Sequence, residues 1–343
     1  MKNESLLEKS KKMICREGTQ GWSLAERTMA QGNYSAPLKE AINYAMSQQD
    51  FFRPTLVSLC CQALGGASKD TVPFGASFVL LGKAVGIHDD IIDNTTMRKK
   101  RPTALGMFGK EIALILSDVL AFKGFTLIRK SAEIGVPTER IMSVLDTIDQ
   151  TWYEQAQSEI VELESRKKLD ISPEECLQKL RMRASEVETI ARVGGILADG
   201  SEDSIENIGR YGRLLGTASL LRDELIDMLE IDVLRHRIRK ESLPLPLILS
   251  AKDTYARANI ASVIVEKRLT SANLRDLSRI SDDTGAMSRV CELISKMVEE
   301  ASSCLRTLSD KTRELALLAN SIRIEEKDWS LPLQPKYTNS TSA

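Results

Sequence analysis

Proline and glycine are scarce in this chain, with 10 and 19 residues among 343. The long stretches between them are rich in helix-forming residues, and alternating β-branched runs are few. This argues against a sheet protein and predicts an all-α fold with short turns. The expected helices cover residues 4–17, 36–48, 52–65, 72–95, 109–132, 138–164, 173–198, 204–230, 242–251, 253–267, 271–280, 284–306 and 310–325.

Signals for a zinc site or a disulfide framework are also missing. The six cysteines show no CxxC spacing, and the chain has two histidines. The 47 Lys and Arg against 48 Asp and Glu leave a net charge of −1, so bulk charge gives no reason to expect nucleic acid as a partner. With 42% hydrophobic residues, the chain can still bury a core, which excludes disorder as the main state.

No apolar run reaches the roughly 18 residues that a membrane helix needs, and the polar start, MKNESLLEKSKK, has no apolar stretch of the kind found in secretory signals. We therefore expect a cytoplasmic protein without a transmembrane segment. No linker of domain-boundary composition interrupts the chain, so one domain is predicted over residues 1–329. Residues 330–343 are rich in Pro, Ser and Thr and predict a flexible C-terminal tail.

What the chain does have is an apolar helix that ends in acids. Residues 73–93 are apolar nearly all round, which is typical of a helix buried in a bundle. Asp89 and Asp93 lie on one helical face, with Asp90 about 100° round the axis. Buried carboxylates need a counter-charge, and no Lys or Arg within this helix lies at pairing distance. A hard divalent cation would supply it, and a solvated helix end bonded to neighbouring arginines is the alternative.

A basic run and a second acidic motif extend this pattern. Residues 98–101 are four consecutive basic residues, which add anion donors beside the first carboxylates. Asp223, Glu224 and Asp227 repeat the acidic spacing on another apolar helix, and further basic residues follow. Two such motifs, facing one another across a bundle, would hold one diphosphate between shared Mg²⁺ ions.

At these motifs the chain resembles the trans-isoprenyl diphosphate synthases, an all-α family that ionises an allylic prenyl diphosphate and joins the carbocation to isopentenyl diphosphate. DDIID with MRKKRPT resembles the family's DDxxD and LRRGxPT, and YGRLLGTASLLRDELIDM resembles its YxxxxGxAFQxxDDxxD. FFRP, RMRAS and RKESLPLP stand where the family has GGKRLRP, RxKTA and GKxTLP. The likeness, from about Arg53 to Pro246, implies a helical bundle of the isoprenoid synthase type with a central cavity, a Mg²⁺-dependent prenyltransferase and a homodimer.

The resemblance also implies roles for particular residues. The Mg²⁺ ligands come from the two acidic motifs: Asp89, Asp90, Asp93, Asp223, Glu224 and Asp227. The cations around the diphosphates are Arg53, Arg98, Lys99, Arg183 and Lys240. The catalytic set is Asp89, Asp93, Asp223, Arg183 and Lys240, in which Arg183 and Lys240 bind the leaving group.

One departure from the family concerns the acceptor. Asp50 and Phe51 stand where the family has Lys-Arg, so the pocket for isopentenyl diphosphate loses two cations and gains an acid. Three hypotheses remain open. They are a chain elongase with an altered acceptor site, a terpene cyclase or prenyltransferase to another acceptor, and a non-catalytic subunit of a heteromeric synthase.

The helix that carries the first acidic motif bears on tail length. In the resembling family, bulky aromatic residues at the places of Ala84 and Val85 stop the product at fifteen carbons. Both side chains are small here, so we expect the channel to continue past Leu81 toward Phe78. A tail of about twenty carbons is therefore predicted, since the helix rises about 16 Å between Phe78 and Asp89.

Overall fold

The protein is almost entirely helical in a computed structural model, which describes residues 5–98, 101–266, 268–308 and 312–324. The all-α prediction is therefore confirmed. The chain divides into two compact units. The first comprises the described residues of Met1–Gln155, Ser185–Arg213 and Ala301–Ser321, and the second those of Ala156–Ala184, Leu214–Glu300 and Ile322–Ala343. The single domain over residues 1–329 stays a prediction, and the predicted tail lies outside the described residues.

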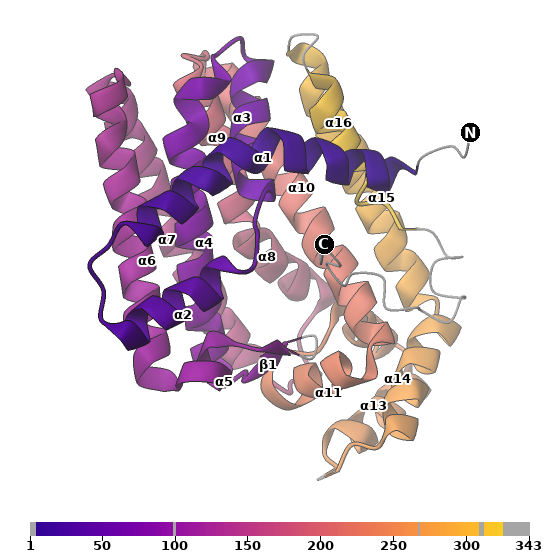
Figure 1. Cartoon of the computed structure of the whole chain (residues 1–343). Helices are drawn as coiled ribbons and strands as arrows, with labels where there is room; N and C mark the ends of the chain where they lie inside the picture. Colours follow the sequence, from indigo (N-terminus) through magenta and orange to yellow (C-terminus); the bar gives the residue numbers. More distant parts are fainter. Residues whose placement is uncertain (1–4, 99–100, 267, 309–311, 325–343) are drawn as a thin grey trace. The chain divides into compact units, whose positions relative to one another are not determined.

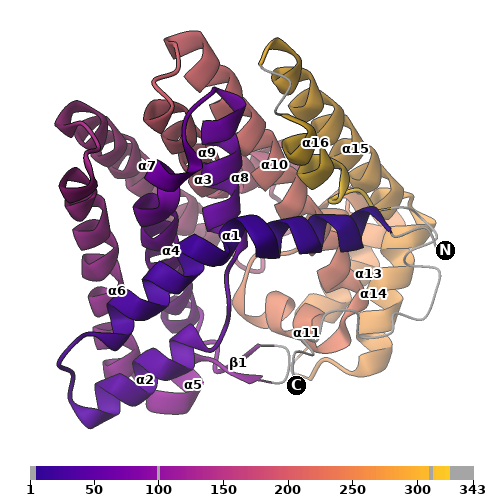
Figure 2. The same cartoon turned by 45° about the horizontal axis from the view of Figure 1, so that its top comes forward.

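The first unit is built around one buried helix, α4 (Val72–Ile92), which packs against α6 (Lys110–Lys130) and is crossed by α1 (Leu6–Ala30) (Figure 1). Further elements of this unit are α2 (Ala36–Met46), α3 (Phe52–Ala63), α5 (Ala104–Phe108), α9 (Ser185–Leu197) and α16 (Arg313–Asn320). The unit also contains most of α7 (Thr138–Ser165) and the start of α10 (Glu202–Leu229). A two-stranded hairpin, β1 (Met97–Arg98) with β2 (Arg101–Pro102), lies next to α5 (Figure 2).

The second unit contains the ends of α7 and α10 together with shorter helices. These are α8 (Pro173–Arg183), α11 (Ile231–Lys240), α12 (Leu245–Ser250), α13 (Thr254–Ile264) and α14 (Ser271–Asp283), followed by most of α15 (Ala286–Cys304). α12 packs against α8 and α14, and α11 packs against α14. This arrangement brings the start of α12 and the end of α11 beside the helix that carries the second acidic motif.

Several predicted helix ends were wrong. α1 continues to Ala30 through Gly18 and Gly21. These glycines mark close packing and not a helix end, because a Cβ at Gly21 would lie 2.6 Å from Pro54 of α3. The missing side chains let α1 lie directly on α3. The helix expected over residues 173–198 is interrupted at Ala184, where the chain passes from the second unit to the first. The helices α5 and α11, the hairpin and a short 3₁₀ turn over Ser68–Thr71 were not predicted.

α4 is also the element that bears on the membrane prediction. Contrary to the expectation that no apolar run is long enough, the stretch Ser68–Ile92 is long and apolar enough by composition to cross a membrane. However, 67% of the apolar window is buried inside the protein, as expected for the core helix of a bundle. Phe74, Val79 and Leu80, for example, are completely buried.

Candidate active site

The first acidic motif lies at the end of α4. The helix ends at Ile92, and Asp93 caps it with a backbone N–H that donates to the carbonyl of Asp89 at 2.9 Å. Asp90 and Asp93 are 8% and 9% exposed, and Asp89 is half-buried. The burial of this helix therefore places carboxylates in an environment that favours a bound cation.

The hairpin after α4 supplies one counter-cation. Arg98, on β1, donates from Nε to Oδ1 of Asp90 at 2.8 Å, although its own side chain is 58% exposed. The alternative of acids bonded to a neighbouring arginine is thus realised for Asp90. Lys99, the second predicted diphosphate ligand of this run, lies outside the described residues. His88, next to the acidic motif, points toward α6, where its Nε2 lies 2.5 Å from Oγ of Ser117.

Arg53, the cation expected at the acceptor site, is bound by two carboxylates within the first unit. Its Nη1 donates to Asp50 at 2.5 Å, and its Nε and Nη2 donate to Glu186 at 2.7 and 3.1 Å. Asp50 also accepts the backbone N–H groups of Phe52 and Arg53, so it caps the start of α3. Gly82 leaves room for the guanidinium, since a Cβ there would collide with it.

The second acidic motif lies near the end of α10, and its three members differ in exposure. Asp223 is exposed, Asp227 is half-buried and Glu224 is 3% exposed. Arg237 of α11 donates from Nη2 to Glu224 at 2.6 Å and from Nη1 to Asp227 at 2.7 Å. The other oxygen of Glu224 accepts the backbone N–H of Leu245 at 2.5 Å. Burial raises the pKa of Asp227 to about 6, although Arg237 acts in the opposite direction.

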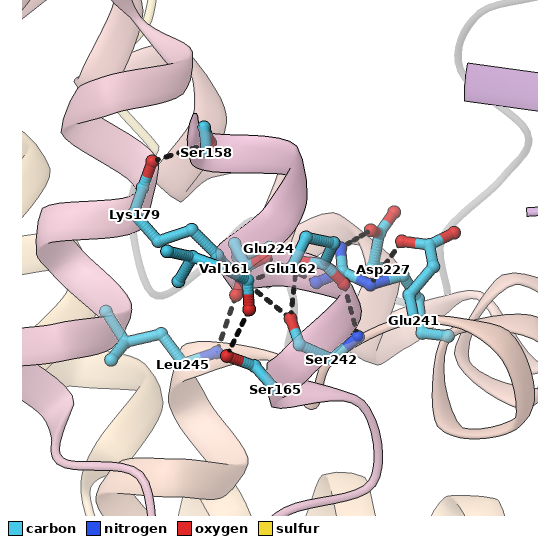
Figure 3. A network of polar contacts seen from close by, with 11 residues as sticks. Ser158, Val161, Glu162, Ser165, Lys179, Glu224, Asp227, Glu241, Ser242 and Leu245 are labelled. Atoms are coloured by element: carbon cyan, nitrogen blue, oxygen red, sulfur yellow. Dashed lines mark hydrogen bonds and ion pairs between the residues drawn. The ribbon is translucent and has the colours of Figure 1, made fainter. Parts of the chain in front are cut away.

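A buried ion pair lies beside this motif in the second unit (Figure 3). Lys179 of α8 and Glu162 of α7 are 3% and 4% exposed, and Nζ lies 2.5 Å from Oε2. Glu162 also accepts both the backbone N–H and the hydroxyl of Ser242. Burial alone would raise the pKa of Glu162, but Lys179 and the Ser242 N–H lower it to about 2. Neither Glu162 nor Lys179 was predicted as functional, because a single charged residue on each of two helices gives no local pattern.

The remaining predicted cations lie in the second unit. Arg183 is the last residue of α8 and is half-buried, and Lys240 is the last residue of α11 and is exposed. Among the residues that the structure describes, no three His, Cys, Asp or Glu side chains are grouped as a metal site. Asp89, Asp93 and Asp223 offer the hard oxygen donors that Mg²⁺ prefers. Glu224 does not fit as a direct ligand, because both of its oxygens already bind protein groups.

An all-α fold with an acid-ended buried helix and a second acidic motif defines a class of enzymes that act on prenyl diphosphates. The polyprenyl synthetase family model matches residues 35–270 of this chain. The chain therefore belongs to the polyprenyl synthetase family, whose members are chain-elongating prenyltransferases, and it is a prenyltransferase.

Individual relatives are distant in sequence. Geranylgeranyl diphosphate synthase of Methanosarcina mazei is 23% identical over 274 residues, covering 78% of this chain and 82% of that protein. A short chain isoprenyl diphosphate synthase of Methanothermobacter thermautotrophicus is 27% identical over 177 residues, covering 51% of this chain and 53% of that protein. The fold matches that of geranylgeranyl pyrophosphate synthetase from Pyrococcus horikoshii, with a TM-score of 0.83, 22% identity and coverage of 93% and 100% of the two chains.

Proposed function

We propose that the protein elongates an allylic prenyl diphosphate with isopentenyl diphosphate, in a Mg²⁺-dependent reaction, to a tail of about twenty carbons. The observation that carries the proposal is the end of α4, where Asp89, Asp90 and Asp93 stand half-buried or buried on an otherwise apolar helix. The similarity to a geranylgeranyl diphosphate synthase supports the chain length.

In this proposal each acidic motif contributes carboxylates to metal binding. Asp89 and Asp93 in the first unit, and Asp223 in the second, are the residues that would bind Mg²⁺, and the ion would supply positive charge to a departing diphosphate. The cations carried over from the family's pattern as diphosphate ligands are Arg98, Lys99, Arg183 and Lys240, of which Lys99 lies outside the described residues. The other three acids are not direct metal ligands in this proposal, because they bind arginines. Asp90 binds Arg98, while Glu224 and Asp227 bind Arg237.

The experiment that tests the proposal uses purified protein, Mg²⁺ and an allylic diphosphate, with and without isopentenyl diphosphate. We expect pyrophosphate release and a longer prenyl diphosphate in the presence of both substrates. The Asp89→Ala variant should remain folded and lose turnover, since it removes a metal ligand and relieves like-charge repulsion. Wild-type product formation by this variant would contradict the assignment.

A second candidate function, prenyl transfer to another acceptor, is favoured by the surroundings of Arg53. All three of its guanidinium nitrogens bind Asp50 or Glu186, so the cation expected to bind the acceptor diphosphate is already neutralised. Pyrophosphate release that needs a different acceptor, with no product from isopentenyl diphosphate, would identify this function.

We also propose that the enzyme is a homodimer and acts in the cytoplasm. Large apolar side chains are exposed along one side of α6, where Ile115 is 52%, Phe122 75% and Phe125 38% exposed. These three positions share a helical face, and burying them against a second copy would remove apolar surface from water. Sedimentation of the wild-type protein and of Phe122→Glu tests the dimer, which the variant should dissociate.

A further inference from the structure

The stretch from the last turn of α11 to the first residue of α12, residues 237–245, includes Lys240 and is held by two buried carboxylates from other helices. We call it the Lys240 segment. Glu224 of α10 holds both ends of this segment, because it accepts from Arg237 at 2.6 Å and from the Leu245 N–H at 2.5 Å. Glu162 of α7 holds the middle through the N–H and hydroxyl of Ser242 (Figure 3). All of these residues belong to the second unit.

Lys179 stabilises the buried carboxylate of Glu162 and so allows Glu162 to bind Ser242. Glu162 is 4% exposed, and a carboxylate so buried would be unfavourable without an adjacent positive charge. Lys179 supplies this charge at 2.5 Å and also donates to the hydroxyl of Ser242. Glu162, Lys179 and Ser242 therefore form a closed group in which each member binds the other two. The backbone of Ser242 is also bridged to that of Arg166, the residue that follows α7.

We propose that Glu162 and Lys179 are positioning residues that fix the Lys240 segment and thereby aim Lys240 at the departing diphosphate. Lys240 lies two residues before Ser242 and is exposed, so its own contacts do not explain its placement in the fold. The segment around it supplies that placement through Ser242 on one side and Arg237 on the other. This proposal rests on the function proposed above for Lys240.

The main test replaces the ion pair as a whole, with Glu162→Leu and Lys179→Met in one protein. Exchanging a buried pair for apolar side chains of similar volume leaves no unpaired charge, so the double variant should fold. It should nevertheless lose the attachment of Ser242. We expect faster hydrogen exchange at the amides of residues 237–245 and a fall in kcat/KM for the allylic diphosphate of about 10-fold to 100-fold, since a small displacement of a charge-stabilising group has effects of this size.

Two further variants keep the test decisive if the double variant does not fold. Ser242→Ala removes the hydroxyl that binds Glu162 and Lys179, whereas Ser242→Thr keeps a hydroxyl in that place. We expect Ser242→Ala to show the same changes at smaller size and Ser242→Thr to restore both exchange and kcat/KM. Arg279→Met is the matched control, because it removes an exposed ion pair of α14 in the same unit and should change neither.

The outcomes separate the two proposals. A folded double variant with wild-type exchange and wild-type kinetics would overturn the positioning role. Slower turnover without faster exchange would overturn it too, because the segment would then be held by other contacts. If Lys240→Ala turns over at the wild-type rate while the double variant exchanges faster, the function proposed for Lys240 fails and the attachment of the segment stands.

Discussion

Nη2 of Arg237 lies 2.6 Å from Oε1 of Glu224, and the two side chains are only 11% and 4% exposed. A residue of the second acidic motif thus finds its counter-cation within the chain. The neighbouring Asp223 is exposed to solvent. The motif therefore contains one acid that is buried against protein groups and one that is accessible to solvent and to a metal ion.

This division predicts opposite effects for two adjacent substitutions. Asp223→Ala should change the free energy of unfolding by less than about 1 kcal/mol, because Asp223 is exposed, and should lower Mg²⁺-dependent turnover by about 100-fold or more. Glu224→Gln should destabilise the second unit by about 1 to 3 kcal/mol, because it removes one of the carboxylates that pair with the buried Arg237, while Asp227 and Glu241 remain. Urea denaturation and turnover measured against Mg²⁺ concentration distinguish the two. Normal product formation by Asp223→Ala would contradict the metal-ligand role that we propose for Asp223.

Asp50 gives a prediction about acceptor affinity. Its carboxylate binds Nη1 of Arg53 and would also repel a diphosphate, so isopentenyl diphosphate should bind weakly. Asp50→Asn removes the charge and keeps an oxygen that can cap α3, and Asp50→Lys adds an attractive charge but loses the cap. We expect both variants to bind isopentenyl diphosphate more tightly, by about 10-fold for Asp50→Lys.

Calorimetric titration of the three proteins with isopentenyl diphosphate measures this effect. The binding of the allylic diphosphate serves as the internal control, because it should change much less. Tight micromolar binding by the wild-type protein would show that other cations replace the two that the pocket lacks.

The sequence predicted the all-α fold because its signals were local. A long apolar helix ending in acids can be recognised from residue spacing alone, and α4 lies where it was expected. The end of α1 could not be predicted in this way. Gly18 and Gly21 have the appearance of helix breakers until α3 is known to pack against them, so the decisive contact is distant in sequence.

The candidate site shows the same limit. Spacing identified Asp223, Glu224 and Asp227 as a group, but the assignment of Glu224 to Arg237 depends on α11, a helix that was not predicted. The pair of Glu162 and Lys179 is separated by 17 residues and joins two helices, so no periodic pattern marks it. Only the folded chain shows that the two charges meet.

The lowered pKa of Glu162 predicts that the stability of the protein depends on pH. Its pKa is lowered from 4.5 to about 2, so its contribution to stability is complete above about pH 4.5 and is lost as the pH falls through about 2. Glu162→Gln should therefore reduce the free energy of unfolding by about 3 kcal/mol at pH 7, and this difference should shrink as the pH is lowered from about 4.5 toward 2. Chemical denaturation of both proteins over this range measures it.

Asp276→Asn is the control for that comparison, since Asp276 pairs with Arg279 at 3.2 Å on an exposed face of α14. The free energy of unfolding of this variant should differ little from that of the wild type at any pH. A difference for Glu162→Gln that stays constant down to pH 3 would show that Glu162 does not carry the acid sensitivity.

The tail-length prediction depends on which face of α4 the prenyl chain follows. Ala84 is completely buried and belongs to the core cluster that includes Leu116 and Leu120 of α6. Val85, on the adjacent face, is half-buried like Asp89 one turn later. The accessible face therefore runs through Val85, and Ala84 packs against its neighbours.

Val85→Phe should accordingly shorten the product. An isoprene unit adds about 5 Å, and the helix rises about 6 Å between Val85 and Asp89. A phenyl ring at Val85 would therefore obstruct the tail near its first unit beyond the diphosphate. Products of about fifteen carbons or fewer should then be favoured. Ala84→Phe, the same exchange one residue earlier, should instead overfill the core and cost about 1 to 3 kcal/mol of stability. Chromatography of the products and thermal denaturation of both variants separate these effects. A folded Val85→Phe protein that makes the wild-type product would place the tail along another face of the bundle.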